Sequence, residues 1–238
     1  MAILIDDEMF GKRVLITGSS SGIGEQLAYR YAKLGSSIML AARRGHLLQK
    51  VAKHCKELSP NNATVSYLAT DLSKMENTLL LIEQTEIILG AIDVLVINHV
   101  APIEFGFWSG SRTNLTTLDE YIDVNFKSYV HLTSHALKLL TKNEGRIIVV
   151  SSVAGKIGTP FQHSYAAAKF ALDGFFTSLR IQFQFTRVRT SVTLCIIGGV
   201  ETDMLNTAMD KFNTTRAMKW FPLENPVDVS RAIVTAGL

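Results

Sequence analysis

The sequence predicts an α/β fold in which a doubly wound parallel sheet lies between two layers of helices. Short apolar runs rich in β-branched residues alternate with longer segments of helical period along almost the whole chain. A glycine-rich turn directly follows the first apolar run. No linker rich in Pro, Gly or Ser interrupts residues 12–234, so the 238 residues are expected to form one domain.

The first unit is predicted to be a strand, a glycine-rich turn and a helix. Residues 13–17 form the expected strand, the turn reads Gly-Ser-Ser-Ser-Gly-Ile-Gly over residues 18–24, and a helical pattern continues to Leu34. Glycines let a ligand approach the backbone closely, and the N-terminus of a helix attracts an anion. The spacing G-x-x-x-G-x-G differs from the G-x-G-x-x-G fingerprint, and no Gly-Lys-Ser/Thr of a P-loop follows. The turn alone is weak evidence for a nucleotide site.

Two arginines, Arg43 and Arg44, follow the second predicted strand at residues 37–42. In dinucleotide-binding folds an acid near this strand end binds the ribose 2′-hydroxyl of NAD, whereas an arginine accommodates the 2′-phosphate of NADP. Ala42 leaves the acidic position empty, and Arg43 supplies a permanent positive charge. We therefore expect NADP(H) in preference to NAD(H). The alternative is two solvated arginines at the end of a strand.

The remaining chain continues the alternation of strands and helices. Asp71 is a candidate N-cap for the helix that follows it. Aromatic residues in an irregular stretch at 102–115 predict a loop over the substrate, with packed surface aromatics as the alternative. Further strands are expected at residues 63–69, 92–97, 146–151 and 191–196, and helices at residues 45–58, 74–89, 117–140 and 226–236.

The strongest chemical signal lies in residues 151–174. Tyr165 and Lys169 are four residues apart, so a helix would project both from one face. A nearby ammonium lowers a tyrosine pKa from about 10 towards the range in which proton transfer is efficient. Ser152 ends an apolar strand and would face the ligand crevice at the carboxyl ends of the strands. Alternatively, Tyr165 and Lys169 are an exposed helix pair without chemistry.

Taken together, these motifs resemble the signature of the short-chain dehydrogenase/reductase family. Thr-Gly-x-x-x-Gly-Ile-Gly follows the first strand, and Ser152 precedes Tyr-x-x-x-Lys by thirteen residues. The motifs occur in order over nearly the whole chain. The resemblance implies a Rossmann-type single domain over residues 1–238 with a substrate lid at residues 204–222. Asn-His-Val-Ala at residues 98–101, where Asn-Asn-Ala-Gly is usual, and Ile197 in place of Pro are similar to the 11β-hydroxysteroid dehydrogenase branch.

The resemblance implies an NADP(H)-dependent oxidoreductase that interconverts a secondary alcohol and a ketone on an apolar substrate such as a steroid. Tyr165 would exchange a proton with the substrate oxygen, Ser152 would bind that oxygen, Lys169 would lower the Tyr165 pKa and bind ribose, and Asn125 would support the proton relay. His99 is expected to be a structural or cofactor-lining imidazole. No metal is expected. The implied cofactor-binding set is Gly18, Ser20, Ser21, Gly22, Ile23, Gly24, Arg43, Arg44, Thr70, Asp71, Leu72, Asn98, His99, Val100, Tyr165, Lys169, Gly198, Val200 and Thr202.

Two alternatives to an active enzyme stay open. One is a protein that senses NADP(H) without turnover. The other is a catalytically impaired or incomplete form, because relatives carry a seventh strand and this sequence ends before one. The expected assembly is a homodimer, and an unpaired sheet edge would promote association.

The composition limits the classes of binding partner and the cellular environments that are expected. A net charge of +3 without a Lys/Arg run does not indicate nucleic acid. Cys55 and Cys195 are too few for a disulfide framework, and Cys195 is expected to be a buried free thiol. Three acidic residues interrupt the most apolar window, at residues 78–98, so no membrane span is expected. The chain as given is expected to be soluble and cytoplasmic, or in the endoplasmic reticulum if an N-terminal anchor is missing from it.

Overall fold

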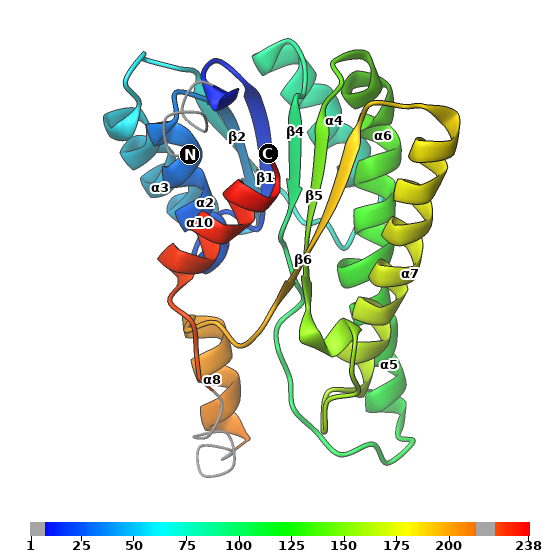
Figure 1. Ribbon diagram of the computed structural model, residues 1–238. Helices are drawn as coiled ribbons and strands as arrows, with labels where there is room; N and C mark the ends of the chain where they lie inside the picture. The colour runs from blue at the N-terminus through cyan, green and yellow to red at the C-terminus, as the bar shows by residue number, and fades with distance from the viewer. Residues whose placement is uncertain (1–7, 213–221) are drawn as a thin grey trace.

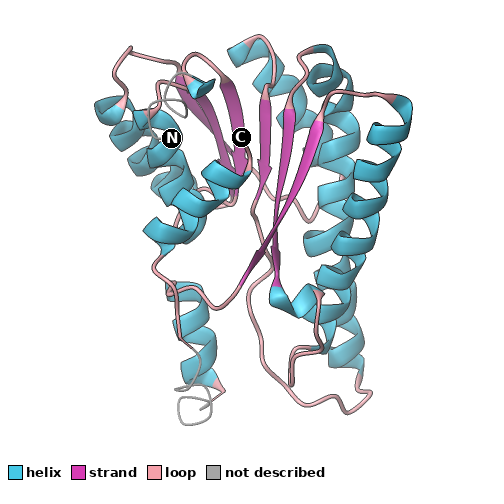
Figure 2. Ribbon diagram, viewed as in Figure 1, coloured by secondary structure: helices cyan, strands magenta, loops and turns pink. Residues whose placement is uncertain are grey.

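The computed structural model describes residues 8–212 and 222–238. Its centre is one parallel sheet of six strands in the order β3-β2-β1-β4-β5-β6 (Figures 1 and 2). The order reverses between β1 and β4, and in such sheets ligands bind beyond the carboxyl ends of the strands at this point. The predicted doubly wound sheet is confirmed. The strands are β1 (Arg13–Thr17), β2 (Ser37–Ala42), β3 (Val65–Ala69), β4 (Val94–Ile97), β5 (Arg146–Ser152) and β6 (Ser191–Ile197).

Helices cover both faces of the sheet and complete three layers (Figure 1). Helices α2 (Gly22–Lys33), α3 (Gly45–Leu58) and α10 (Pro226–Ala236) pack on one face, where their buried residues share one hydrophobic cluster with the strands. Helices α4 (Glu76–Leu89), α6 (Ser128–Lys142) and α7 (His163–Thr186) pack on the other face around a second cluster. Helices α5 (Arg112–Ile122) and α8 (Asp203–Lys211) lie at the end of the molecule where β5 and β6 finish.

The strands read as continuous apolar runs because both faces of the sheet are covered. Successive side chains of a strand point to opposite faces. Val14 and Ile16 therefore belong to the cluster under α2 and α3, whereas Leu15 between them belongs to the cluster under α4 and α6. Each such side chain is fully buried, which stabilises the fold by roughly 1.5–3 kcal/mol relative to an exposed one.

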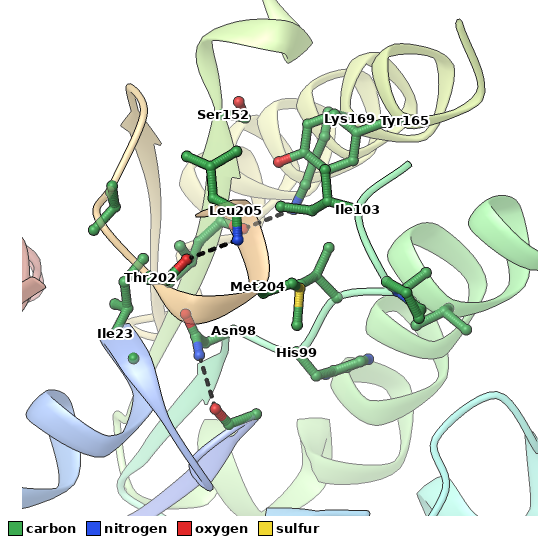
Figure 3. Close-up of a pocket in the computed structure, with 18 of the residues that line it drawn as sticks. Ile23, Asn98, His99, Ile103, Ser152, Tyr165, Lys169, Thr202, Met204 and Leu205 are labelled. Atoms are coloured by element: carbon green, nitrogen blue, oxygen red, sulfur yellow. Dashed lines mark hydrogen bonds between the residues drawn. The ribbon is translucent and has the colours of Figure 1, made fainter. Parts of the chain in front are cut away.

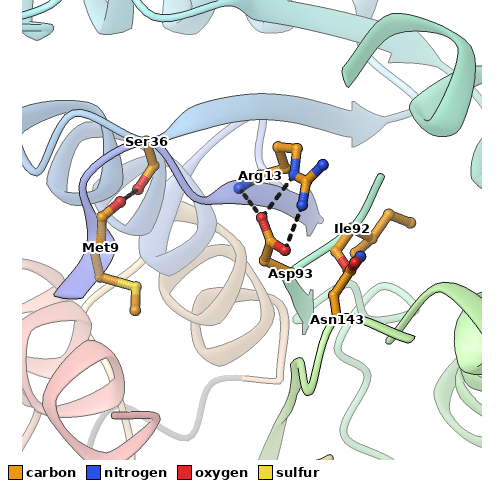
Figure 4. A network of polar contacts seen from close by, with 6 residues as sticks. All are labelled: Met9, Arg13, Ser36, Ile92, Asp93 and Asn143. Carbon is orange, nitrogen blue, oxygen red and sulfur yellow. Dashed lines mark hydrogen bonds and ion pairs between the residues drawn. The ribbon is translucent and has the colours of Figure 1, made fainter. Parts of the chain in front are cut away.

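An ion pair fixes the register of the two central strands at their amino ends (Figure 4). Asp93 accepts the main-chain N–H of Arg13 at 2.8 Å and two bonds from its guanidinium group at 2.7 and 2.8 Å. Burial raises the pKa of Asp93, but the hydrogen bonds and the charge of Arg13 outweigh it and hold the pKa below its ordinary value. Nearby, Asn143 donates from Nδ2 to the main-chain oxygen of Ile92 at 3.2 Å.

The helix expected over residues 117–140 differs from the structure in two respects. The helix begins at Arg112, because Ser111 caps it by accepting the N–H of Asn114 at 3.2 Å. A π-helical turn at Asp123–Lys127 then separates α5 from α6, which continues to Lys142. The irregular stretch expected up to residue 115 consequently ends at Ser111. Smaller differences of two residues occur at the starts of β3, β4 and α4.

Candidate active site

One cavity of about 910 Å³ opens at the carboxyl ends of the strands. Its walls come from the turn between β1 and α2, the ends of β2, β4 and β5, the first turns of α7 and the stretch from β6 into α8 (Figure 3). Every residue of the predicted set lines it except Gly24 and Asn125. The structure therefore brings together residues from seven separate parts of the sequence, because Thr70, Asp71 and Leu72 after β3 also line the cavity.

Close packing accounts for the glycines of the first turn. Gly18 has a φ of +65°, and a Cβ added there would lie 2.7 Å from the Cα of His99. A Cβ on Gly24 would lie 2.2 Å from the main-chain oxygen of Gly18, so Gly24 is needed beneath the turn and not at the cavity surface. The turn and the end of β4 thus touch backbone to backbone, which leaves the cavity side of the turn open.

Both arginines after β2 line the cavity, in different ways. Arg44 donates from Nη2 to the Ser20 hydroxyl at 3.0 Å and to the Ser21 hydroxyl at 2.6 Å, which ties it to the glycine turn. Arg43 is exposed, and its charge acts on Asp71. The sequence singled out Arg43 and gave no sign of the role of Arg44 in the turn.

Asp71 does not cap α4, whose N-cap residue is Met75. Its carboxylate instead accepts the N–H of Ser73 at 3.0 Å and closes the turn after β3. Burial raises the Asp71 pKa, but the bonds from Ser73 and the charge of Arg43 leave it below its ordinary value. The capping alternative for Asp71 was wrong because two further turns separate it from the helix.

Tyr165 and Lys169 lie one turn apart on α7 and face the end of β5, where Ser152 stands (Figure 3). The Lys169 Nζ lies 5.7 Å from the centre of the Tyr165 ring. It donates to the main-chain oxygen of Val150 at 3.0 Å. The Ser152 hydroxyl accepts the N–H of Ala154 at 3.1 Å, and its interaction with Tyr165 lowers the Tyr165 pKa.

Burial governs the protonation of this group. It raises the pKa of Tyr165 above its ordinary value, and the hydrogen bond with Ser152 only partly offsets this. Burial also lowers the pKa of Lys169 to about 7, which favours the neutral amine. The expectation that Lys169 brings the Tyr165 pKa below its usual value is therefore not met in the protein alone. Burial is the largest cause of the pKa shift in each group.

Asn125 lies behind the cavity wall in the π-helical turn and is fully buried. Its Oδ1 accepts the N–H of Ala101 at 2.8 Å. Its Nδ2 has no hydrogen-bond partner within the described part of the chain. A buried amide donor without a partner costs about 1–3 kcal/mol, which makes this position suited to a bound water or another acceptor.

His99 is buried at the end of β4 and bonds through both ring nitrogens. Its Nδ1 lies 2.8 Å from the Thr17 hydroxyl, and its Nε2 lies 2.6 Å from the Ser128 hydroxyl. Burial, together with the charge of Lys169, lowers the His99 pKa to about 3. Sequence reasoning missed Thr17 and Ser128. Thr17 was the more detectable of the two, because it is a hydroxyl residue at the end of an otherwise apolar strand.

Apolar side chains form the part of the cavity nearest Tyr165. Ile103, Met204 and Leu205 lie there (Figure 3), and other lining residues include Phe105 and Phe161. Of the lid expected at residues 204–222, the structure describes α8 and Phe212, and residues 213–221 lie outside the described part.

Residues 8–212 and 222–238 contain neither a membrane-spanning helix nor a metal-binding cluster. No helix in these ranges combines the length and apolar character needed to cross a bilayer. No cluster of three or more His, Cys, Asp or Glu side chains there could hold a metal ion. Cys55 and Cys195 are both buried free thiols, as expected for Cys195.

Known sequences resemble this chain over most of its length. The hydroxysteroid 11-beta-dehydrogenase 1-like protein of Gallus gallus is 41% identical over 231 residues, which are 97% of this chain and 77% of that protein. The 1-like protein B of Xenopus laevis is 44% identical over 194 residues, 81% of this chain and 65% of that protein. The chain thus spans about two thirds to three quarters of the length of these relatives.

Solved structures share the fold. Levodione reductase superposes with a TM-score of 0.87 at 21% identity, with 96% of this chain and 92% of that chain covered. Carveol dehydrogenase from Mycobacterium avium, in complex with NAD, gives 0.83 at 19% identity over 96% and 91%. A Shigella flexneri protein complexed with NADP gives 0.80 at 25% identity over 96% and 92%. The sequence profile of the short chain dehydrogenases matches residues 12–212. The chain belongs to this family of NAD(P)-dependent oxidoreductases.

Proposed function

We propose that this protein is an NADP(H)-dependent oxidoreductase that interconverts a ketone and a secondary alcohol on an apolar substrate such as a steroid. One observation carries the proposal. Tyr165, Ser152 and Lys169 meet at one end of a cavity whose other end holds a glycine turn and two arginines. A proton donor and a dinucleotide cradle in one cavity are the two parts that carbonyl reduction needs.

The residues present fit a dinucleotide. The glycine turn offers main-chain atoms without side chains in front of α2, and no side chain caps the N–H groups of the first turn of α2. Arg43, Arg44 and Ser20 provide a charged, hydrogen-bonding pocket at the end of β2, where an acid would favour NAD. Solved relatives bind NAD or NADP, so the preference for NADP(H) rests on these side chains. When bound, the nicotinamide would supply the hydride.

Side chains of the protein would transfer the proton to the substrate oxygen. As the substrate carbon gains a hydride, its oxygen gains negative charge and takes the phenolic proton of Tyr165, which completes the alcohol. The Ser152 hydroxyl, beside Tyr165, would donate a hydrogen bond to the same oxygen. Lys169 would stabilise the resulting phenolate, bind ribose hydroxyls, and with Asn125 return a proton to Tyr165. These four side chains are the proposed catalytic group.

The apolar wall supports an apolar substrate. Ile103, Phe105, Phe161, Met204 and Leu205 surround the space in front of Tyr165. The names of the relatives refer to hydroxysteroid dehydrogenases, which is consistent with a ketone on a large apolar skeleton. We propose that α8 and the residues after it, up to residue 222, act as the substrate lid of a single domain.

The test is oxidation of NADPH, and separately of NADH, by the whole chain with a panel of apolar ketones that includes steroid ketones. Turnover with NADPH is expected, and Tyr165→Phe should lower it by about 10²–10⁴-fold while NADPH still binds. Tyr67→Phe is the matched control, because Tyr67 is 39% exposed on β3 and lies away from the cavity. Tight NADPH binding without turnover of any ketone or alcohol would favour the binding or regulatory alternative.

The homodimer stays a prediction, to be tested by sedimentation.

A further inference from the structure

His99 joins two parts of the site that are far apart in the sequence. Thr17, at the end of β1, lies 2.8 Å from its Nδ1, and Ser128, at the start of α6, lies 2.6 Å from its Nε2. His99 is 9% exposed, and both of its ring nitrogens already have partners within the protein. The imidazole is therefore a rigid connection between the strand that carries the glycine turn and the helix that follows the π-helical turn.

Hydrogen counting fixes which ring nitrogen carries the proton. The Ser128 hydroxyl has one hydrogen, and it donates this to the main-chain oxygen of Val124 at 2.7 Å. Ser128 must then accept from His99, which places the proton on Nε2. Thr17 can donate to the bare Nδ1 at 2.8 Å, since its other acceptor, the Val96 oxygen, is 3.4 Å away. The opposite tautomer would reverse both contacts of the ring and exchange the 2.7 Å bond from Ser128 to Val124 for the 3.4 Å bond from Thr17 to Val96.

The bonds then run in one direction, from Thr17 to His99, from His99 to Ser128, and from Ser128 to Val124. Val124 belongs to the π-helical turn and directly precedes Asn125. In the same turn the N–H of Ser128 bonds to the main-chain oxygen of Asp123, five residues back. The Ser128 hydroxyl thus bonds into the widened turn that presents Asn125.

A second contact ties the same segment to Asn125 and Lys169. Two residues after His99, the N–H of Ala101 donates to the Asn125 side chain at 2.8 Å. The hydroxyl of Tyr129 donates to the main-chain oxygen of His99, and the Tyr129 ring centre lies 5.3 Å from the Lys169 Nζ. The segment from His99 to Ala101 therefore contacts Asn125 directly. It also contacts Tyr129, whose ring lies beside Lys169.

We propose that His99 is a positioning residue, held as the neutral Nε2–H tautomer, that sets the π-helical turn and thereby the side chain of Asn125. The expected effect of His99 on kcat rests on the proposed function. The tautomer and the bonds to Thr17 and Ser128 rest on the geometry alone. His99 itself takes no proton during turnover. A residue at this position without a donor that reaches Ser128 would leave the Ser128 hydroxyl and the turn free to shift, and a displacement of about 1 Å can cost 10²-fold in rate.

Three substitutions and one control substitution in the whole chain separate this role from simple packing. Ser128→Ala removes the bond while His99 remains. Ser134→Ala is its matched control, because Ser134 makes the same bond to the carbonyl four residues back, 2.8 Å to Val130, on the exposed side of α6. His99→Gln keeps an amide N–H that can reach Ser128, whereas the shorter side chain of His99→Asn can serve only the Thr17 side.

Ser128→Ala and His99→Asn should each speed amide hydrogen exchange at residues 125–129 and lower kcat by about 10–100-fold, with the KM for NADPH unchanged. Ser134→Ala should do neither, and His99→Gln should recover most of the loss. In ¹⁵N-histidine NMR, the His99 signal, assigned by its absence in His99→Gln, should show Nε2 protonated and no titration from pH 5 to 9. The facing charges of Lys169 and Arg43 also oppose a second proton on the ring.

A bare Nε2, a titration in that range, or equal effects of Ser128→Ala and Ser134→Ala would overturn the proposal. So would a His99→Asn variant that performs as well as His99→Gln. If the wild type reduces no ketone, the proposed function fails, yet the tautomer and the exchange rates still decide the role of His99. If Ser128→Ala does not fold, the two His99 variants and the NMR measurement carry the test.

Discussion

The side chain of Lys169 is bound to the main chain of Val150, with its Nζ donating to the carbonyl oxygen at 3.0 Å. This bond holds the amine inside the protein beside β5, where burial lowers its pKa to about 7. An unfolded lysine keeps its charge up to about pH 10.4. Folding therefore removes a charge from Lys169 at any pH between these values, and this removal costs stability.

Replacement of Lys169 by methionine should raise the free energy of unfolding although it abolishes turnover. The gain should be roughly 1–3 kcal/mol near pH 7, because methionine avoids desolvation of the amine but loses the bond to Val150. The penalty in the wild type is complete below pH 7 and fades as the pH approaches 10.4, since the unfolded state then also loses its proton. Urea unfolding of both proteins at pH 7 and pH 10 measures this. A gain that grows with pH would contradict it.

Removal of the Arg43 guanidinium should weaken NADPH binding and spare NADH. The expected loss for Arg43→Ala is roughly 1.5–3 kcal/mol, the size of a hydrogen bond to a charged group. Arg44→Ala should weaken both cofactors, because Arg44 also braces Ser20 and Ser21 in the glycine turn. Isothermal titration with both cofactors separates the two cases, with Arg180→Ala, on the exposed side of α7, as the control. Equal losses for Arg43→Ala would remove the 2′-phosphate role.

An alanine at Gly18 should damage both stability and cofactor binding. The new Cβ would lie 2.7 Å from the Cα of His99, and the backbone there has a φ of +65°. Gly110→Ala is a matched control, since Gly110 has a φ of +71° and open space around it. Backbone strain is common to both variants, at about 1 kcal/mol. We expect a clearly lower Tm for Gly18→Ala than for Gly110→Ala. Equal Tm values would mean that the glycine turn can move away from His99 to make room for the new Cβ.

Four phenylalanines connect the loop before α5, the start of α7 and the end of α8. The ring centre of Phe161 lies 5.0 Å from that of Phe107 and 5.2 Å from that of Phe212, and Phe105 lies 5.9 Å from Phe212. Aromatic pairs of this kind contribute about 0.5–1.5 kcal/mol each. Phe212→Ala should therefore raise the KM for a bulky ketone several-fold and leave kcat for a small ketone unchanged.

Steady-state kinetics with two ketones of different size tests this prediction. Phe185→Ala provides the comparison, because Phe185 is 85% exposed on α7. A change in kcat for the small ketone would indicate that the cluster shapes the chemistry and does not merely retain the substrate.

The sequence was sufficient for the sheet and the order of its strands, because these depend on local pattern, whereas most of the candidate site residues came from the resemblance to a family. Apolar runs predict buried strands, and side chains at their carboxyl ends must share one edge. Ser152 and Tyr165 could be placed in one cavity on these grounds alone.

The connections behind the cavity could not be predicted in this way. Ser128 reads as an ordinary helix residue, and its bond to His99, like the bond of Asn125 to Ala101, comes from the loop after β4. The raised pKa of Tyr165 also depends on burial that a four-residue spacing does not reveal. Each missed feature arises from packing between segments distant in sequence.

The central position of β1 has a consequence for how the chain is made. Val14 pairs with Ile38 on one side and with Val94 on the other. At a synthesis rate of roughly 5–20 residues per second, several seconds pass between the appearance of β1 and that of β4. Throughout this interval the nascent chain exposes an apolar strand with one open edge. The ion pair of Arg13 with Asp93 can form only when β4 arrives, so β1 and β4 can join before the second half of the chain, which carries Ser152 and Tyr165, has been made.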